Sequence, residues 1–310
     1  MKVLFIGLGS IARRHIRNLR ALCQDNVHIT VLRSGNGAEP DRETAGRIDR
    51  TIYHSCELLS RYDAVFITNP TALHYDTLLA CQDKSDCFFI EKPVFATGEE
   101  DISPFLLPKK AYYVACPLRY TNVIRYLKEQ IDFSKIYAMR CISSSYLPDW
   151  RPGTDYRDTY SAHRSMGGGV SVDLVHEWDY IYYLAGAPRE VKSLIEKKSR
   201  LEIDADDIAV YIADYPDKVV ELHLDYFGRE TVRKIELFGE EDTIYADLHH
   251  QKIEWARQGK VMDLSQQRDE FQKRELGHFL QIAAGTCACD HGIGEACEVL
   301  RITRGKNVCL

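Results

Sequence analysis

The chain has 310 residues, 45% of them hydrophobic, which is enough for two domains that each bury a core. Its net charge of −6 argues against a nucleic acid or an anionic membrane as partner. No run approaches the roughly 20 apolar residues of a membrane span. The ten cysteines are scattered and contain no pair of C-x-x-C motifs, so neither a zinc site nor a disulfide framework is indicated. We therefore expect a cytoplasmic protein with reduced thiols and no metal.

The first apolar run, residues 2–6, is typical of a buried strand, and the loop GLGSIA at 7–12 leads from it into a helix. A G-x-G-x-x-A loop between strand and helix is the setting in which the dinucleotide fingerprint carries meaning. Gly7 permits the tight turn, and Gly9 lets backbone N–H groups approach a pyrophosphate. Ala12 still allows the helix to pack closely on the strand. This pattern predicts a dinucleotide-binding domain.

The second strand, expected at 28–32, should end near the adenine ribose. An NAD site usually has an acid there, which accepts a hydrogen bond from the ribose 2′-OH. Arg33 and Ser34 occupy this place instead, and the first acid is Glu39. Because Arg33 with Ser34 could bind a 2′-phosphate, the sequence favours NADP over NAD. An equally good interpretation is that Arg33 is only a solvated loop residue.

Strands are also expected at 63–68, 87–90 and 112–115, and the ligand of such a sheet binds beyond the carboxyl ends of the strands. Glu91, Lys92 and Pro93 follow the strand at 87–90 directly, and Lys92 could also be a plain surface charge. Pro93 would hold its backbone extended. The expected cofactor contacts are Gly7, Gly9, Ser10, Ile11, Ala12, Arg33, Ser34, Asn69, Pro70, His74, Glu91 and Lys92.

The character of the sequence changes after residue 118, where a helix at 121–130 and a strand at 135–144 are expected. The segment 146–166 is long, irregular and rich in Tyr, Trp, Arg and Asp. Long loops without secondary structure are usually functional, so it could face a substrate, with aromatic rings stacking on a sugar and arginines holding an acid. Loop packing and surface charge explain the same residues equally well. The candidate substrate contacts are Arg119, Tyr120, Trp150, Tyr156, Arg157 and His163.

Three glycines at 167–169 precede a stretch that reads as one helix to Gly186. Helical spacing separates an apolar stripe from a polar side, on which Asp173 and His176 lie one turn apart. The same side is expected to carry Tyr180 and Tyr183. Asp173 and His176 could handle a proton together. They could equally be a helix-terminal acid and a packed ring.

Between 191 and 255 the pattern is that of strands, and the turn at 216–217 indicates antiparallel pairing. Helices are expected near 270–284 and 294–304. We therefore expect an α/β protein with a doubly wound Rossmann domain at 1–118 and a second domain at 119–310.

These features together resemble the Gfo/Idh/MocA family of oxidoreductases. The motifs concerned are GLGSIARRH at the start, DAVFITNPTALH, EKP at 91–93, LRY at 118–120, GGGVSVDLVHEWD, and ELGHF at 275–279. The resemblance implies a Rossmann domain followed by an α+β domain with a largely antiparallel open sheet, which commonly supports oligomers. It also implies hydride transfer between NADP or NAD and a sugar-like alcohol. We therefore expect a sugar-like substrate and, because of the sheet, a homodimer or homotetramer.

Position by position, the resemblance assigns Lys92 to the lysine of the EKP motif, near the nicotinamide and the reacting hydroxyl. His176 matches the acid/base histidine, because Asp179 follows three residues later. Asp173 matches the preceding aspartate, although the spacing here is D-x-x-H rather than D-x-x-x-H. Two alternatives stay open: a cofactor-binding sensor without turnover, and a reductase of an imine or linear tetrapyrrole. The presence of both Lys92 and His176 favours an enzyme.

Overall fold

The computed structural model describes residues 1–35, 37, 39–57 and 60–306. Asn36, which belongs to the loop after the second strand, lies outside these residues. The chain forms two compact units, Met1–Pro117 with Arg268–Cys297, and Leu118–Gln267 with the residues from Glu298 on. We expected every residue after 118 to belong to one domain. The segment Arg268–Cys297 instead clusters with the first unit, because its helix packs against the first helix of the chain.

The first unit is built on a six-stranded sheet in which every pairing is parallel. Its order β3-β2-β1-β4-β5-β6 is that of a doubly wound Rossmann sheet and confirms the expected fold. The order reverses between β1 and β4, so ligands are expected beyond the carboxyl ends of these strands. The strands are β1 Lys2–Ile6, β2 His28–Leu32, β3 Arg50–Ile52, β4 Ala64–Ile67, β5 Cys87–Ile90 and β6 Ala111–Val114.

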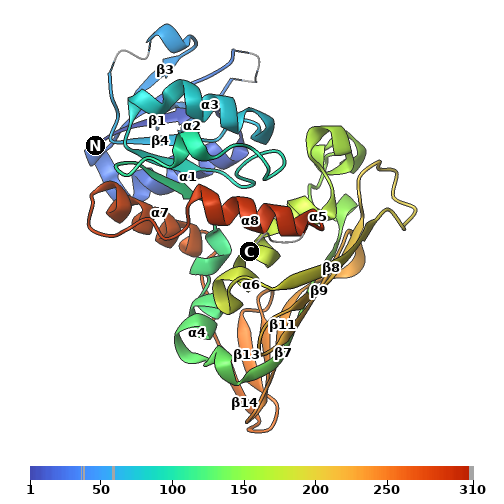
Figure 1. Cartoon of the computed structure of the whole chain (residues 1–310). Helices are drawn as coiled ribbons and strands as arrows, with labels where there is room; N and C mark the ends of the chain where they lie inside the picture. Colours follow the sequence, from blue (N-terminus) through green and yellow to red (C-terminus); the bar gives the residue numbers. More distant parts are fainter. Residues whose placement is uncertain (36, 38, 58–59, 307–310) are drawn as a thin grey trace. The chain divides into compact units, whose positions relative to one another are not determined.

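Among the described residues, the α-helices that lie wholly in this unit are α1 Ser10–Cys23, α2 Arg42–Ala45, α3 His74–Cys81 and α7 Glu270–Ala283. In Figure 1 the red α7, from late in the sequence, lies beside the blue α1. The Phe279 ring of α7 stands edge-on to Phe66 and Phe89 of the sheet, at 5.3 and 5.2 Å between centroids. Such aromatic pairs add about 0.5–1.5 kcal/mol to the free energy of burial, so α7 is part of this core.

The second unit contains an eight-stranded sheet of order β14-β13-β12-β11-β7-β10-β9-β8. Only β7 and β10 pair in parallel, which confirms the largely antiparallel sheet. The strands are β7 Ile136–Tyr146, β8 Glu190–Glu196, β9 Ile208–Asp214, β10 Val219–Asp225, β11 Phe227–Gly239, β12 Thr243–Asp247, β13 Lys252–Trp255 and β14 Lys260–Asp263.

Helices of the second unit cover one face of this sheet. The Trp178 ring stands edge-on to Tyr211 of β9, with centroids 5.4 Å apart, and both side chains are buried. The helices are α4 Asn122–Gln130, α5 Val170–Asp173 and α6 Val175–Ala185, and α8 Ile293–Thr303 continues into this unit from the first. The Thr303 carbonyl at the end of α8 accepts a hydrogen bond from the Tyr211 hydroxyl (2.6 Å), which fixes α8 to the same side of β9.

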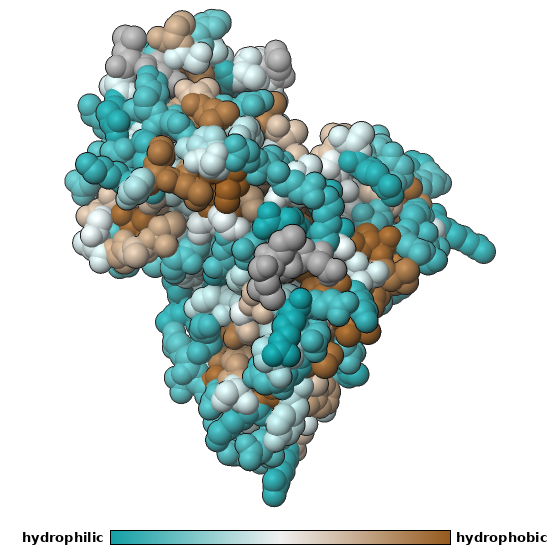
Figure 2. Space-filling model, in the orientation of Figure 1, coloured by the Kyte–Doolittle hydropathy of each residue, from teal (hydrophilic) through white to brown (hydrophobic). Residues whose placement is uncertain are grey.

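Hydrophilic side chains dominate the surface seen in Figure 2, with apolar patches between them. Over the part of the chain that the structure describes, no helix combines the length and the apolar character needed to cross a membrane.

Candidate active site

The glycine loop forms an open cradle at the carboxyl end of β1. Gly7 has φ +95°, and a Cβ there would lie 2.8 Å from backbone atoms of Asn69, so only glycine fits the turn. Gly9 is different, because a Cβ there would meet nothing within 4 Å. No described side chain caps the start of α1, and its first turn has no acidic residue. Unfilled N–H groups facing open space are what a pyrophosphate requires, so these residues fit a dinucleotide.

A basic hollow of about 320 Å³ lies next to this cradle. It is lined by Ser10, Arg13, Arg14, Arg17, Arg268 and Asp269. Arg17 is paired with Asp269 at 2.6 Å and Arg13 with Asp41 at 3.3 Å, so acids offset part of the charge. The surplus of arginines still favours an anionic ligand near the start of α1. Of these residues we expected only Ser10 in the site, although the A-R-R-H-x-R sequence of the helix carried the signal for its arginines.

The loop after β2 holds Arg33 in a closed set of contacts. Its Nη1 donates to Glu39 Oε2 (2.7 Å) and to the Tyr53 hydroxyl (3.3 Å), and its Nη2 donates to the Gly37 carbonyl (3.1 Å). The hydrogen bond to Glu39 raises the pKa of Arg33 against the effect of burial. Ser34 beside it is exposed. Glu39 therefore brings an acid to the end of β2, where the local sequence shows none, and this acid is bound to Arg33.

The loop after β4 is braced by a buried histidine. His74, 1% exposed, places Nε2 2.9 Å from the Asn69 carbonyl and Nδ1 3.1 Å from the Val94 carbonyl. Burial lowers the pKa of His74, although both carbonyls oppose this effect. Asn69 is half-buried and Pro70 is exposed, so the loop after β4 reaches the surface at these residues. His74 thus joins the Asn69 loop to the segment that follows Lys92.

Lys92 follows β5, and a buried pair holds its neighbour. His15 of α1 places Nε2 2.5 Å from Glu91 Oε1, and both side chains are at least 88% buried. Burial works to raise the pKa of Glu91, but the hydrogen bond and charge of His15 outweigh it and lower the pKa. Glu91 Oε2 also accepts a hydrogen bond from the Lys92 backbone N–H (3.2 Å). The pair therefore ties the helix of the glycine loop to the backbone of Lys92. We did not foresee His15, since nothing in the sequence pairs it with Glu91.

In the second unit the glycine triplet serves close contacts within the protein. A Cβ at Gly168 would lie 2.1 Å from the Tyr160 carbonyl, and one at Gly169 would lie 2.3 Å from Asp206 Oδ1. Asp206 Oδ2 accepts a hydrogen bond from the Ser171 N–H (2.9 Å) at the start of α5. These glycines therefore let the preceding loop and Asp206 pack against the helix start.

The stretch we expected to be one helix is broken at Leu174 (φ −96°, ψ 32°), between α5 and α6. His176 is the only residue from 170 to 181 that is not buried. The expected polar side is wrong at Tyr180, whose side chain is fully buried. Asp173 lies before the break and accepts a hydrogen bond from the Tyr226 hydroxyl (2.6 Å). The sequence offered no sign of this partner, which lies 53 residues away.

The loop of 146–166 contains short 3-10 turns whose side chains bind one another and residues outside the loop. Trp150 stands edge-on to Tyr226 at 5.2 Å, and the Tyr156 hydroxyl accepts a hydrogen bond from the Glu202 N–H (3.2 Å). Arg157 pairs with Asp155 (2.6 Å) and Glu202 (2.7 Å), and its carbonyl lies 2.7 Å from His163 Nε2. These contacts shape the loop, and Arg157 keeps about half of its side chain exposed.

Arg119, a candidate substrate contact, lies instead in a buried ion pair. Its Nη2 and Nε donate to the two oxygens of Asp179, at 2.8 and 3.1 Å, and both side chains are less than 10% exposed. Its guanidinium also lies 4.7 Å from the centre of the Tyr183 ring. Tyr120, next to it, is half-buried at the end of a 3-10 turn. Arg119 therefore fastens this turn to α6, and its role as a substrate contact stays a prediction.

Comparison with known proteins agrees with both sheets. The model of an oxidoreductase family with an NAD-binding Rossmann fold matches residues 1–102, and that of the GFO/IDH/MocA C-terminal domain matches 124–245. Inositol 2-dehydrogenase/D-chiro-inositol 3-dehydrogenase of Lacticaseibacillus casei is 25% identical over 191 residues, which are 59% of this chain and 53% of that protein. The chain thus spans only about half of this relative.

Two further proteins are similar over more of the chain. Myo-inositol 2-dehydrogenase of Thermotoga maritima is 24% identical over 267 residues, 80% of this chain and 75% of that protein. A levoglucosan dehydrogenase in complex with NADH has the same fold, with a TM-score of 0.82 at 18% identity over 98% of this chain and 95% of that one. The two domain models together match most of the sequence, in the order in which the two sheets occur. The chain is therefore a member of the Gfo/Idh/MocA family of NAD(P)-binding oxidoreductases.

Proposed function

We propose that this chain is a dehydrogenase that exchanges a hydride between a nicotinamide cofactor and a secondary alcohol or ketone of a sugar, acidic sugar or sugar derivative. Residues 1–118 would hold the cofactor, and 119–310 would supply the substrate contacts. The observation that carries the proposal is the buried His15–Glu91 pair. It holds Lys92 beyond the carboxyl end of β5, on the sheet edge that also bears the glycine cradle. The inositol and levoglucosan dehydrogenases among its relatives favour a polyhydroxylated substrate.

Each group in the proposed mechanism has one task. The bound nicotinamide supplies the hydride chemistry. His176 accepts the hydroxyl proton during oxidation and returns it during reduction. The ammonium of Lys92 donates a hydrogen bond to the oxygen and stabilises its developing negative charge. His176 is the second residue of α6, where the helix dipole favours the neutral ring that a base must have. Asp173, which lies on the other side of the break at Leu174, orients the imidazole of His176.

A screen of substrates tests the proposal. Sugars, uronic acids, inositols and nucleotide sugars are each offered with NAD+ and NADP+, and the absorbance of the reduced nicotinamide is followed. Turnover of at least one polyol is the expected result. Tight cofactor binding without turnover of any candidate, in either direction, would instead support a sensor, and turnover of an imine or tetrapyrrole alone would move the assignment to another reductase class.

We propose a preference for NADP(H), set by the Arg33–Glu39 pair. A 2′-phosphate would replace Glu39 on the guanidinium, so Arg33→Ala should weaken NADP(H) by about 1–3 kcal/mol, the range for a charged hydrogen bond. Glu39→Gln should strengthen NADP(H), because it removes the competing carboxylate. Dissociation constants for both cofactors, measured by titration, decide the matter. If Glu39→Gln leaves NADP(H) unchanged and weakens NAD(H), then Glu39 accepts from a ribose 2′-OH and the preference is for NAD.

We also propose that the chain is a homodimer or homotetramer joined through the open face of the eight-stranded sheet. Ile212 of β9 and Val219 of β10 point away from the face that α6 covers, and they are 54% and 42% exposed. An uncovered apolar sheet face favours association. Light scattering at micromolar concentration should give at least twice the chain mass. Ile212→Lys should lower it, whereas Leu106→Lys, at a site 66% exposed in the first unit, should not. A wild-type monomer contradicts the proposal.

A further inference from the structure

An open cavity of about 710 Å³ lies at the edge of the first unit's sheet opposite the glycine cradle. Its walls include the residues that lead into three strands: Asp63 before β4, Cys87 at the start of β5 and Ala111 at the start of β6. Four-residue strands separate this edge from the carboxyl ends by about 13 Å, at 3.3 Å per residue. The cavity is therefore distinct from the proposed cofactor site.

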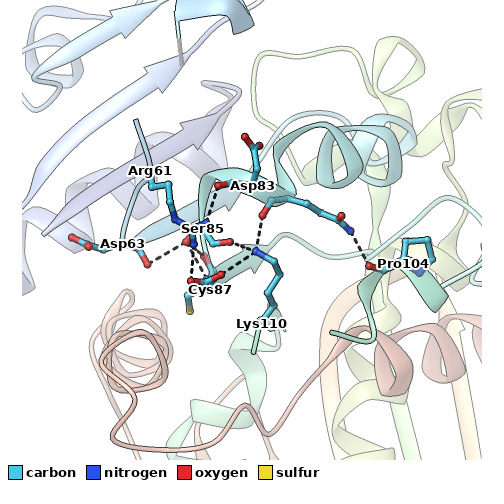
Figure 3. A network of polar contacts seen from close by, with 9 residues as sticks. Arg61, Asp63, Asp83, Ser85, Cys87, Pro104 and Lys110 are labelled. Atoms are coloured by element: carbon cyan, nitrogen blue, oxygen red, sulfur yellow. Dashed lines mark hydrogen bonds and ion pairs between the residues drawn. The ribbon is translucent and has the colours of Figure 1, made fainter. Parts of the chain in front are cut away.

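One wall of the cavity is held in shape by Lys110. Its ammonium donates hydrogen bonds to the carbonyls of Gln82 and Ser85, both at 2.6 Å, in the turn before β5 (Figure 3). Arg61 on the same wall pairs with Asp86 at 2.6 Å. The facing wall is the segment after α7, which brings Cys287 and Cys289 to the cavity. Three thiols, those of Cys87, Cys287 and Cys289, thus face one cavity whose walls are fixed by hydrogen bonds.

Cys287 lies next to a histidine that is itself bound to a carboxylate. His278 of α7 places Nε2 2.8 Å from Asp290 Oδ1 and Nδ1 4.0 Å from Cys287 Sγ. A carboxylate can only accept, so it holds the proton on Nε2 and leaves the lone pair of Nδ1 facing the thiol. This is the arrangement of a nucleophile, a base and a group that orients the base. All three residues lie in the segment 278–290 of the first unit.

The thiols of Cys87 and Cys289 are not suited to be the first nucleophile. Burial raises the pKa of Cys87 to about 12 and that of Cys289 to about 11, so both stay protonated at neutral pH. Among the described residues no cluster of His, Cys, Asp and Glu could hold a metal ion, which removes the usual structural reason for thiols to gather. Cys87, Cys287 and Cys289 are all free thiols.

We propose that Cys287 is a reactive thiol with His278 as its base, and that this cavity is a site of oxidation by small hydroperoxides. Cys287 Sγ passes its proton to His278 Nδ1 and attacks one peroxide oxygen. The O–O bond breaks, Cys287 becomes a sulfenic acid, and the leaving oxygen takes the proton back from His278 and departs as water or an alcohol. The Cys289 sulfur then attacks the sulfenic sulfur, and its proton leaves with the displaced hydroxide as water, so that a disulfide forms and two thiols are oxidised for each peroxide reduced.

The reactivity of Cys287 is measured first, by mass spectrometry of peptides after brief treatment with iodoacetamide at pH 7. The exposed Cys56 in the same chain is the internal reference. A free thiol is only a few per cent ionised at this pH, so Cys287 should react roughly tenfold faster than Cys56. His278→Gln should remove this advantage. Asp290→Asn, at a side chain 57% exposed, should reduce it without a risk to folding. His249→Gln, a change of an exposed histidine elsewhere, is the matched control.

The oxidation is then followed with hydrogen peroxide. In the wild type we expect a disulfide that contains Cys287. In Cys289→Ser we expect a sulfenic acid at Cys287 that dimedone traps. Equal alkylation rates for Cys287 and Cys56, or a Cys287 rate unchanged in both His278→Gln and Asp290→Asn, would overturn the proposal. So would peroxide treatment that leaves Cys287 reduced while Cys56 is oxidised.

Discussion

We expect His176→Ala to lower kcat by about 10²–10⁴-fold, the range for loss of a general acid or base. The substitution should disturb folding little, because His176 is half-buried and is the only position from 170 to 181 that is not buried. Cofactor affinity should stay the same, since the glycine cradle lies in the other unit. Steady-state kinetics with a substrate from the screen, together with cofactor titration, provides both measurements. His249→Ala, at an exposed histidine, serves as the matched control.

Lys92→Ala should cause a loss of similar size, because the developing negative charge on oxygen then has no cationic partner. The two losses should fall well short of additive in the double variant, since both residues act on one proton transfer. Glu91→Gln tests how Lys92 is held: kcat should fall less than in Lys92→Ala. A His176→Ala enzyme with nearly full kcat would mean that α6 is structural only.

Local pattern was enough to predict the Rossmann unit. The strands at 2–6, 28–32 and 87–90 are short apolar runs next to turn residues, and the structure places β1, β2 and β5 at the same residues. β3 escaped notice because its three residues, Arg50–Ile52, carry a single buried side chain. β14 at Lys260–Asp263 has no buried residue and exists through its pairing with β13. Strands of these kinds are defined by their neighbours, and no sequence period marks them.

The tight turn at Gly7 was predictable, because only glycine fits that backbone position, whereas the roles of Gly9 and Lys92 toward a cofactor stay predictions. The site was not predictable where a role depends on a distant partner. His15 and Glu91 are 76 residues apart, and nothing in either neighbourhood indicates that they pair. Glu39 is a second example at shorter range. It lies six residues after Arg33, and the sequence does not show that the loop folds back and brings the two side chains together. Side-chain partners in loops follow from the fold, which the local sequence does not contain.

Arg119→Ala should lower the free energy of unfolding of the second unit by about 3–5 kcal/mol, because it leaves Asp179 buried without a counter-charge. The three tryptophans, Trp150, Trp178 and Trp255, all lie in this unit, so their fluorescence in a urea titration reports its unfolding. The matched control is Arg125→Ala on α4, whose pair with Glu129 is exposed on both sides. An exposed pair of this kind contributes about 0–1 kcal/mol.

A double variant separates the cost of the unpaired charge from the value of the pair. Arg119→Met with Asp179→Leu fills the space of the ion pair with apolar side chains and leaves no buried charge. Most of the lost stability should therefore return. If Arg119 instead bound a substrate, Arg119→Ala would raise KM, leave the urea midpoint unchanged, and gain nothing from Asp179→Leu. A stability loss that the second substitution repairs is therefore specific to an ion pair that fastens the turn at Arg119 to α6.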